Sequence, residues 1–566
     1  MSVPFGLLTR DHNQTLTVAH VDHLPIIAQY LRTLGLVKII NDLVPVEMAV
    51  EPGLIVLGLI LDTLSGRSPL YHLEKTFEDY DQQVLFGQAL PPSYFNDDNV
   101  GRIMDRIYEV GTQKIFSAIS VAAMREFSVS TKHVHFDTTS VNLYGDYTNT
   151  MDDKAPFKIT HGYSKDKRPD LKQFVLSLLC VDGNIPLVGQ IVDGNASDKK
   201  INHTVLSEIS WHMNKHGVAD NAFIYVADSA MVTEENLKEA ELFISRLPAT
   251  YNECDRAILD AVDADQWTEV GCISVTPASK KRPNAVYRVQ EQTVTLYDKE
   301  YRAVVVHSSA HDRRREKRLE KELTQSLKQA NSLAKEINKK RFFCRADAEQ
   351  AAKELSAQTT QYHLLEVEIV ECPCYGPGRP KKGVPKAPVR IEYPLVAKIA
   401  EQEEAIARCR QMIGCFVLLT TVPDDKDEGG YSAEMILRTY KDQHGIENNF
   451  GFLKDDQIVN AVFLKRAERI EVLGLILLLS LLVWRLMEHT MRTQLKETDA
   501  SLPGWDNKPT QRPTSYMMTW KFKEIIIIRI GQECQLAKPL TPTQKAFLKA
   551  LDVPESCFIN HENLKK

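Results

Sequence analysis

Two segments rich in β-branched and aromatic residues most constrain what this chain can fold into. Segment 221–228, Asn-Ala-Phe-Ile-Tyr-Val-Ala-Asp, is almost entirely apolar until it ends on Asp228. Such a run is typical of a strand buried on both faces, as in the centre of an α/β sheet. Segment 133–141 predicts a second strand, with Asp137 near its exit. Side chains at strand ends project into the crevice where α/β sheets bind ligands, so both aspartates are candidate site residues.

A third acidic residue, Glu447, lies in the segment 440–454, Tyr-Lys-Asp-Gln-His-Gly-Ile-Glu-Asn-Asn-Phe-Gly-Phe-Leu-Lys. On one continuous helix, at about 100° per residue, four polar side chains share an arc of roughly 60°. They are Tyr440, Gln443, Glu447 and Lys454. An adjoining apolar stripe, formed by Ile446, Phe450 and Leu453, would dock this helix on a core. A carboxylate between a phenol and an ammonium suits a site that holds a cation and a phosphodiester together.

Three carboxylates supply hard oxygen ligands, which favour Mg²⁺ or Mn²⁺ and not zinc. Two such ions can activate the attacking oxygen of a phosphodiester reaction and stabilise the leaving oxygen. The alternative for each residue alone is structural: an aspartate after a strand commonly caps a turn, and a glutamate on a helix is commonly a solvated charge. The spacing of Tyr440 and Lys454 around Glu447 favours the site.

At these residues the sequence resembles the DDE transposases of bacterial insertion sequences, a branch of the ribonuclease-H-like superfamily. One subgroup carries the signature Tyr-x2-Arg-x3-Glu-x6-Lys, and Tyr440, Glu447 and Lys454 fit its spacing. Gln443 stands at the arginine position, which puts one charged contact to DNA phosphate in doubt. Segments 161–173 and 192–199 resemble the family's sequence between its two aspartates. The resemblance covers residues 90–490.

The resemblance implies that Asp137, Asp228 and Glu447 are the catalytic metal ligands, with Asp137 bridging two Mg²⁺ or Mn²⁺ ions in each active site. It implies hydrolysis at the terminal inverted repeats, followed by attack of the freed 3′-hydroxyl on target DNA. Tyr440, Gln443 and Lys454 would contact this double-stranded DNA, and a homodimer would hold the paired ends. Two alternatives stay open: a nuclease of the same fold that only hydrolyses, and a catalytically silent repressor or architectural protein.

Composition places limits on location and partners. The net charge is −6 and the pI is about 6.3, so DNA binding must depend on local basic patches. The ten cysteines include no C-x2-C pair, and the start of the chain has no signal-peptide pattern, which favours a free-thiol cytosolic protein. The apolar run 472–484 is too short to span a bilayer. We expect a bacterial cytoplasmic, nucleoid-associated protein with no membrane partner.

The pattern along the chain predicts an α/β fold with a ribonuclease-H-like mixed-sheet core. A helical N-terminal domain, 1–130, would bind DNA ends. Core residues 131–249 and 411–492 would be interrupted by an insertion, 250–410, of strands and a basic helical arm. Segment 493–566 would complete the chain, with a possible role in dimerisation. Strands are expected at 132–141, 157–164, 172–181 and 185–192, and a helix near 199–216.

The expected insertion contains three candidate features. A basic helix at 313–341 would pack against a helix at 392–411. Segment 375–383, Tyr-Gly-Pro-Gly-Arg-Pro-Lys-Lys-Gly, resembles the AT-hook type of minor-groove binder, in which Arg379, Lys381 and Lys382 would contact DNA. A plain Pro/Gly-rich linker is the alternative. Trp267 could stack on an unpaired base or serve as a structural aromatic residue.

Overall fold

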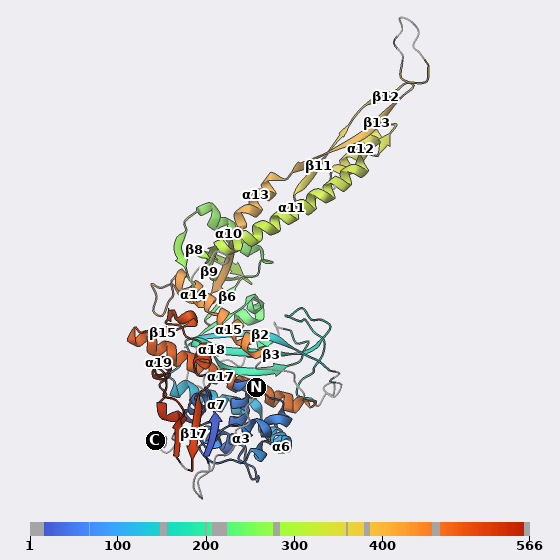
Figure 1. Ribbon diagram of the computed structural model, residues 1–566. Helices are drawn as coiled ribbons and strands as arrows, with labels where there is room; N and C mark the ends of the chain where they lie inside the picture. Colours follow the sequence, from blue (N-terminus) through green and yellow to red (C-terminus); the bar gives the residue numbers. More distant parts are fainter. Residues whose placement is uncertain are drawn as a thin grey trace. The chain divides into compact units, whose positions relative to one another are not determined.

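In the computed structural model, the strand that contains Asp137 and the strand that directly precedes Asp228 are neighbours in one sheet. Figure 1 labels β2, β3 and β6 of this sheet. β2 (His133–Leu143) pairs in parallel with β5 (Ile224–Ala227), which pairs in parallel with β6 (Phe243–Arg246). On its other side β2 pairs antiparallel with β3 (Lys172–Val181), and β3 pairs antiparallel with β4 (Ile185–Val192). The strand order is therefore β4-β3-β2-β5-β6. This mixed sheet, with helices around it, confirms the mixed α/β class.

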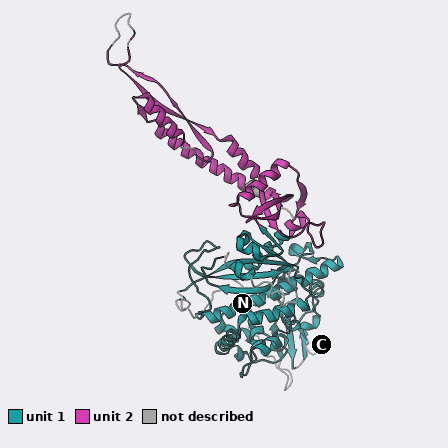
Figure 2. Ribbon diagram, turned by 180° about the vertical axis from the view of Figure 1, so that it is seen from behind, with its two compact units in different colours: residues 1–245, 439–566 teal, residues 246–438 magenta. Residues whose placement is uncertain are grey.

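The chain divides into two compact units, residues 1–245 with 439–566 and residues 246–438 (Figure 2). The residues described are 16–66, 68–145, 147, 155–197, 201–206, 223–274, 283–357, 360–378, 385, 387–455, 464–531 and 533–559. α14 (Ala433–Asp442) lies at the second boundary in the chain. Asp137, Asp228 and Glu447 all belong to the first unit.

In the sequence of the first unit, helices both precede and follow the strands of the sheet. They are α1 (Leu24–Thr33), α2 (Leu36–Leu43), α3 (Pro52–Ser65), α4 (Leu73–Glu78), α5 (Gln82–Phe86), α6 (Asp97–Val110), α7 (Thr112–Glu126), α9 (Glu234–Glu239), α15 (His444–Leu453), α17 (Ala467–Thr498), α18 (Ser515–Lys521) and α19 (Pro542–Leu551). Residues 201–206 are also helical, within the expected helix 199–216. The helices of residues 24–126 lie in the same compact unit as the sheet.

α17 is the central helix of this unit. It packs against α3, α6, α7, α19 and β4. By length and composition alone it could cross a membrane, with a mean hydropathy of 2.2 over its most apolar window, but 78% of that window is buried inside the protein. Burial of this extent favours a core helix, because apolar side chains that already pack against protein gain nothing further from lipid.

A small second sheet joins the start of the described chain to its end. β1 (Leu16–His20) pairs antiparallel with β17 (Ile526–Ile530), which pairs antiparallel with β18 (Glu533–Leu536). β17 includes most of a run of four isoleucines at 525–528, of which Ile527 is only 1% exposed. Because β17 has a partner on both edges, this apolar strand offers no free edge for aggregation. A short hairpin, β15 (Leu502–Pro503) with β16 (Pro509–Thr510), precedes α18.

The second unit combines an antiparallel sheet with a long helical arm. Its strands β14-β9-β8-β7 are hydrogen-bonded in that order. Its elements are α10 (Asn252–Ala264), β7 (Thr268–Cys272), β8 (Val286–Leu296), β9 (Lys299–Ser308), α11 (Ser309–Ile337), β10 (Arg341–Phe342), α12 (Arg345–Ser356), β11 (His363–Ile369), β12 (Cys372–Cys374), β13 (Arg390–Glu401), α13 (Glu403–Met412) and β14 (Cys415–Thr420). The arm has a core of its own, with Ala330, Ile337 and Leu395 buried between α11, α12 and β13.

Two secondary-structure expectations outside the candidate site were wrong. Segment 157–164 forms no strand, and among the described residues its only β-bridge pairs Thr160 with Gln173. The helix expected at 392–411 is strand β13 followed by the shorter helix α13. β13 is a strand because it serves as the common partner of β10, β11 and β12, a long-range pairing that overrides local helix propensity.

Candidate active site

Asp137 lies within β2, and Asp228 directly follows β5, the parallel neighbour of β2. The register of these two strands pairs His133 with Ile224 and His135 with Val226, which is the last pair. Continued by two residues along each strand, the same register sets Asp137 opposite Asp228. Residues in register on parallel strands are about 4.8 Å apart and point to the same face of the sheet. We therefore infer that the two carboxylates share one face at the end of the short strand β5.

Backbone amides hold both carboxylates. Thr138 N–H donates to Oδ1 of Asp137 at 2.7 Å, and Ala230 N–H donates to Oδ1 of Asp228 at 3.0 Å. Asp228 thus caps a short 3-10 helix (Ser229–Met231), which was the structural alternative for this residue. Asp137 was expected near the exit of its strand, but it lies in the middle, because β2 continues to Leu143 by pairing with β3.

A lysine that the sequence did not single out lies beside Asp137. Nζ of Lys165 is 3.7 Å from Oδ1 of Asp137, and it donates to O and Oγ1 of Thr138 at 2.7 and 2.8 Å. The Asp137 side chain is only 24% exposed. A cation this close to a partly buried carboxylate offsets part of its charge.

The segment 440–454 is not one continuous helix. α14 ends at Asp442 and α15 begins at His444, with Gln443 between them. The amide of Gln443 bonds to the carbonyl of Tyr440, a tightened i→i−3 bond instead of i→i−4. Tyr440 therefore lies on a different helix from Glu447, and the four polar side chains do not share one helical arc. Lys454 is the C-terminal cap of α15.

The first turn of α15 lies next to the aspartate pair. Nε2 of Gln443 donates to the carbonyl oxygen of Phe136, the residue before Asp137, at 3.5 Å. Glu447 follows one turn later, on the same side of the helix as Gln443. Gly445 permits α15 to pack closely on the turn that precedes β4, because a Cβ there would lie 2.0 Å from the side chain of Asn184.

Glu447 itself points to solvent and to a histidine. Its side chain is 66% exposed, and Oε2 lies 2.6 Å from Nδ1 of His444. Among the residues that the structure describes, no group of three His, Cys, Asp or Glu side chains is close enough to hold a metal ion. Asp137 and Asp228 are thus brought together, whereas Glu447 stands near them but is paired with His444.

Lys454 bonds to a loop of the same unit. Nζ of Lys454 donates to both carboxylate oxygens of Asp166 at 2.8 Å, and Asn142 donates to Oδ2 of Asp166 at 3.0 Å. Asp166 belongs to segment 161–173, one of the two segments that carried the family resemblance. The C-terminal end of α15 is therefore tied to the loop that precedes β3.

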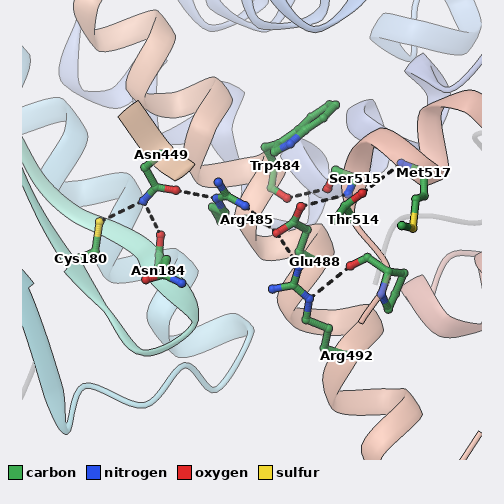
Figure 3. A network of polar contacts seen from close by, with 11 residues as sticks. Cys180, Asn184, Asn449, Trp484, Arg485, Glu488, Arg492, Thr514, Ser515 and Met517 are labelled. Atoms are coloured by element: carbon green, nitrogen blue, oxygen red, sulfur yellow. Dashed lines mark hydrogen bonds and ion pairs between the residues drawn. The ribbon is translucent and has the colours of Figure 1, made fainter. Parts of the chain in front are cut away.

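A buried polar network fixes α15 against α17 (Figure 3). Nδ2 of Asn449 donates to the carbonyl of Asn184 at 2.8 Å and to Sγ of Cys180 at 3.2 Å, and its Oδ1 accepts from Arg485 Nε at 2.6 Å. Arg485 also pairs with Glu488 at 2.7 Å. Asn449 is fully buried, and burial also raises the pKa of the neighbouring Cys180 thiol to about 12.

Glu488 is the centre of this network. Its side chain is 2% exposed and pairs with Arg485 and Arg492, the latter at 3.0 Å. Its other oxygen accepts from the amide of Ser515, at the start of α18. Burial lowers the pKa of Arg492, which nonetheless stays beside the carboxylate. The network thereby connects the Glu447 helix to the C-terminal segment.

A histidine cluster lies at the opposite end of β2. Nδ1 of His133 is 2.8 Å from Oδ1 of Asp182, whose other oxygen accepts from Ser130. Burial lowers the pKa of His135 to about 4, with a further contribution from His133. In the described part of the chain, Nδ1 of His135 has no hydrogen-bond partner. The cluster is separate from the aspartate pair and contributes no residue to it.

The remaining candidate DNA contacts are only partly placed. Arg379, Lys381 and Lys382 lie outside the described residues. In the second unit, Trp267 is partly buried and has the guanidinium of Arg288 4.7 Å from its ring centroid. His307 flanks the same ring at 6.1 Å, so these contacts favour the structural role for Trp267 over base stacking.

Comparisons with known proteins give a family match to part of the chain and a distant structural similarity. The family described as "Domain of unknown function (DUF4277)" matches residues 16–121, within the helical part of the first unit. No curated protein matches the sequence. One similar solved structure is a cryo-EM structure of a piggyBac transposase synaptic complex with hairpin DNA, at 8% identity over 94% of this chain and 79% of that one. The TM-score of this structural alignment is 0.36.

Sequence reasoning missed the residues that support the site. Lys165, Asp166 and His444 reach their partners from other loops and turns, and a single charged residue in a loop gives no periodic signal. Asn449, Arg485 and Glu488 are polar residues on otherwise apolar helix faces. A buried polar group of this kind is the one available sequence signal, because it requires a partner.

Proposed function

We propose that this chain is a metal-dependent DNA transposase of an insertion sequence, which cleaves at terminal inverted repeats and transfers the freed 3′-hydroxyl to target DNA. The observation that carries the proposal is the parallel pairing of β2 with β5, whose register, continued past the last pair His135–Val226, sets Asp137 opposite Asp228. The family signature around Glu447 supports the same function. A homodimer on paired ends follows from the need for one active site at each end.

The donor set fits a divalent cation. Asp137 and Asp228 offer adjacent hard oxygen ligands, and Glu447 is one helical turn past the contact between Gln443 and Phe136. Mg²⁺ or Mn²⁺ at these carboxylates would supply Lewis-acid polarisation of the phosphodiester. Glu447 completes the set if its carboxylate turns from His444 toward the aspartates, a side-chain rotation available to an exposed residue.

The protein's own residues would bind and orient DNA. Lys165 keeps part of the Asp137 charge balanced and ties the loop 161–171 to β2. Tyr440, on α14, and Lys454, at the end of α15, flank Glu447 and would hold phosphates on either side of the cut. In hydrolysis, water adds to phosphorus while the bond from phosphorus to the 3′-oxygen breaks, leaving a 3′-hydroxyl and a 5′-phosphate. In strand transfer, that hydroxyl replaces water.

A second candidate function is a catalytically silent DNA-binding repressor or architectural protein. The observation that favours it is the pairing of Glu447 with His444 in place of the aspartates. Such a protein would bind the element ends without cutting them, in any divalent cation.

A cleavage assay on the flanking inverted repeats separates the two functions. We expect nicking in Mg²⁺ or Mn²⁺ and none in EDTA. Asp137→Ala, Asp228→Ala and Glu447→Ala should each abolish it while retaining end-DNA binding in Ca²⁺. Glu234→Ala, which removes an exposed carboxylate that pairs with Lys238, is the matched control and should cleave normally. Cleavage by Asp137→Ala would contradict the site, and binding without cleavage by the natural chain would favour the silent protein.

A further inference from the structure

The C-terminal segment of the first unit exposes three large aromatic side chains close together in sequence. Trp505 is 51% exposed, Tyr516 is 38% exposed and Trp520 is 57% exposed. Trp484, in contrast, is 3% exposed in the core of the same unit. Burial of a large aromatic side chain is favourable relative to its exposure to water, so three exposed ones on one short segment point to a binding surface.

The first tryptophan stands on a hairpin tip. β15 and β16 pair Leu502 with Thr510, and Asp506 and Asn507 between them both have positive φ, 56° and 57°. Aspartate and asparagine tolerate this left-handed conformation, and two such residues in a row form the tight turn that hairpins favour. Trp505 directly precedes this turn, so the hairpin presents it at its end.

The other two aromatic residues stand on one face of α18. Tyr516 and Trp520 are four residues apart and therefore neighbours on the helix surface. The opposite face is anchored: Met518 is fully buried, and Oγ of Ser515 donates to the carbonyl of Trp484 at 2.8 Å (Figure 3). Nζ of Lys521 donates to Oδ1 of Asn507 at 3.0 Å, which holds the end of α18 to the hairpin. The aromatic side chains thus stand on a rigid support.

This surface carries more basic than acidic side chains, although the chain as a whole does not. Residues 505–523 contain four basic side chains against one acidic side chain, whereas the net charge of the chain is −6. The basic residues are Lys508, Arg512, Lys521 and Lys523. Nζ of Lys523 lies 4.1 Å from the centroid of the Trp520 ring, so a cation and an aromatic face are presented together.

The surface is continuous with the end of the candidate active-site helix. Oη of Tyr516 donates to Oδ2 of Asp455 at 3.1 Å, and Asp455 follows Lys454 in the chain. The ring of Tyr516 also packs edge-on against Trp484, with centroids 4.9 Å apart. A strand held at Lys454 would therefore have α18 next to it.

We propose that this C-terminal aromatic surface (Trp505, Tyr516, Trp520 and the four basic residues) binds unpaired DNA nucleotides, with bases stacked on the tryptophans and phosphates held by Lys508 and Arg512. Aromatic platforms in basic surroundings bind single strands with little sequence preference, because every base has a π-face. This inference rests on the proposed function, in which cleavage frees a strand end beside α15. The surface gives that end a place to bind.

The test is binding of a fluorescent oligo-deoxythymidine of about 15 nucleotides, measured by anisotropy without divalent metal. Trp520→Ala and Trp505→Ala should each weaken binding roughly 5- to 100-fold. Trp520→Phe should lose less, because it keeps an aromatic ring. The matched control is Tyr297→Ala, an aromatic residue 44% exposed in the β8–β9 hairpin beside Asp298, which should bind like the natural chain. Circular dichroism should show that all variants are folded.

Two outcomes would overturn the inference. One is equal affinity of the natural chain and Trp520→Ala for the single strand. The other is a change from dimer to monomer in sedimentation with unchanged single-strand affinity, which would make the surface a contact between protein copies. Failure of the proposed function gives a different result: the natural chain would not cleave the element ends in Mg²⁺ or Mn²⁺, while it would still bind the single strand and Trp520→Ala would still bind it more weakly.

Discussion

Arg485 and Asn449 join the central helix to the helix that carries Glu447: Nε of Arg485 donates to Oδ1 of Asn449 at 2.6 Å. Asn449 comes two positions after Glu447 in the chain, which places their side chains about 200° apart around α15. Asn449 is completely buried, so Glu447 must face outward, where it is 66% exposed. The buried network therefore sets the direction in which the third carboxylate of the candidate site points.

Glu488→Ala should lower the free energy of unfolding by about 3–5 kcal/mol. The substitution leaves Arg485 and Arg492 without their shared carboxylate in a site where Glu488 is 2% exposed, and an uncompensated buried charge is costly. Urea denaturation of the full chain measures the change. Glu497→Ala, an exposed glutamate on the same helix, is the matched control and should change stability by no more than about 0.5 kcal/mol. Equal effects of the two substitutions would show that the network contributes nothing specific.

His135 should make the protein less stable in mild acid. Its folded pKa of about 4 lies below the ordinary 6.5, so the unfolded chain binds a proton first as the pH falls from 6.5 toward 4. Stability is lost across that window, by about 2 kcal/mol at pH 5 for this residue. Burial alone would raise the pKa of Asp182, but hydrogen bonds from His133 and Ser130 lower it below the ordinary 3.8. The stability that Asp182 contributes is therefore lost only below about pH 3.8, outside the window of His135.

The measurement is the free energy of unfolding of the natural chain and of His135→Leu at pH 7 and pH 5. His135→Leu should show the smaller loss between the two values. His23 and His489 also have pKa values lowered by burial, so some acid sensitivity should remain in the variant. An unchanged difference between pH 7 and pH 5 would mean that His135 is protonated in the folded protein.

Sequence periodicity predicted the strands of the site but not their surroundings. The apolar run before Asp228 identified β5 because a strand buried on both faces needs apolar residues throughout. The alignment of Asp137 with Asp228 depends on strand pairing, which no local pattern encodes. The break at Gln443 was missed for the same reason: Gly445 lies against Asn184, more than 250 residues earlier, and that contact cannot be read from helical spacing. Lys165 reaches Asp137 through an irregular loop, where sequence gives no period at all.

Segment 375–383 (the hook segment), which resembles an AT-hook, should bind DNA through Arg379, Lys381 and Lys382. It joins β12 to β13, which pair as far as Cys374 and Arg390. Replacing Arg379, Lys381 and Lys382 with Ala should lower affinity for A/T-rich duplex DNA. The slope of log K against log salt concentration should also become shallower, by about 0.9 for each phosphate that the variant no longer neutralises. A triple variant of Lys238, Lys398 and Lys545 removes the same charge from lysines already paired with carboxylates, and should bind normally. Unchanged affinity of the hook variant at low salt would make the segment a plain linker.

Lys454 should contribute to DNA binding by contacting a phosphate directly, in addition to bonding to Asp166 in the loop before β3. Its ammonium bonds to Asp166, and the two side chains are 24% and 38% exposed, so a phosphate can reach the same ammonium. Lys454→Ala should weaken end-DNA binding and reduce the salt slope by about 1. Asp166→Asn removes the competing carboxylate while keeping Lys454, so it should bind end DNA as tightly as the natural chain or tighter. Anisotropy titrations over a range of salt concentrations measure both. If Asp166→Asn weakens binding as much as Lys454→Ala does, the pair serves only to position the loop before β3, and Lys454 is not a phosphate contact.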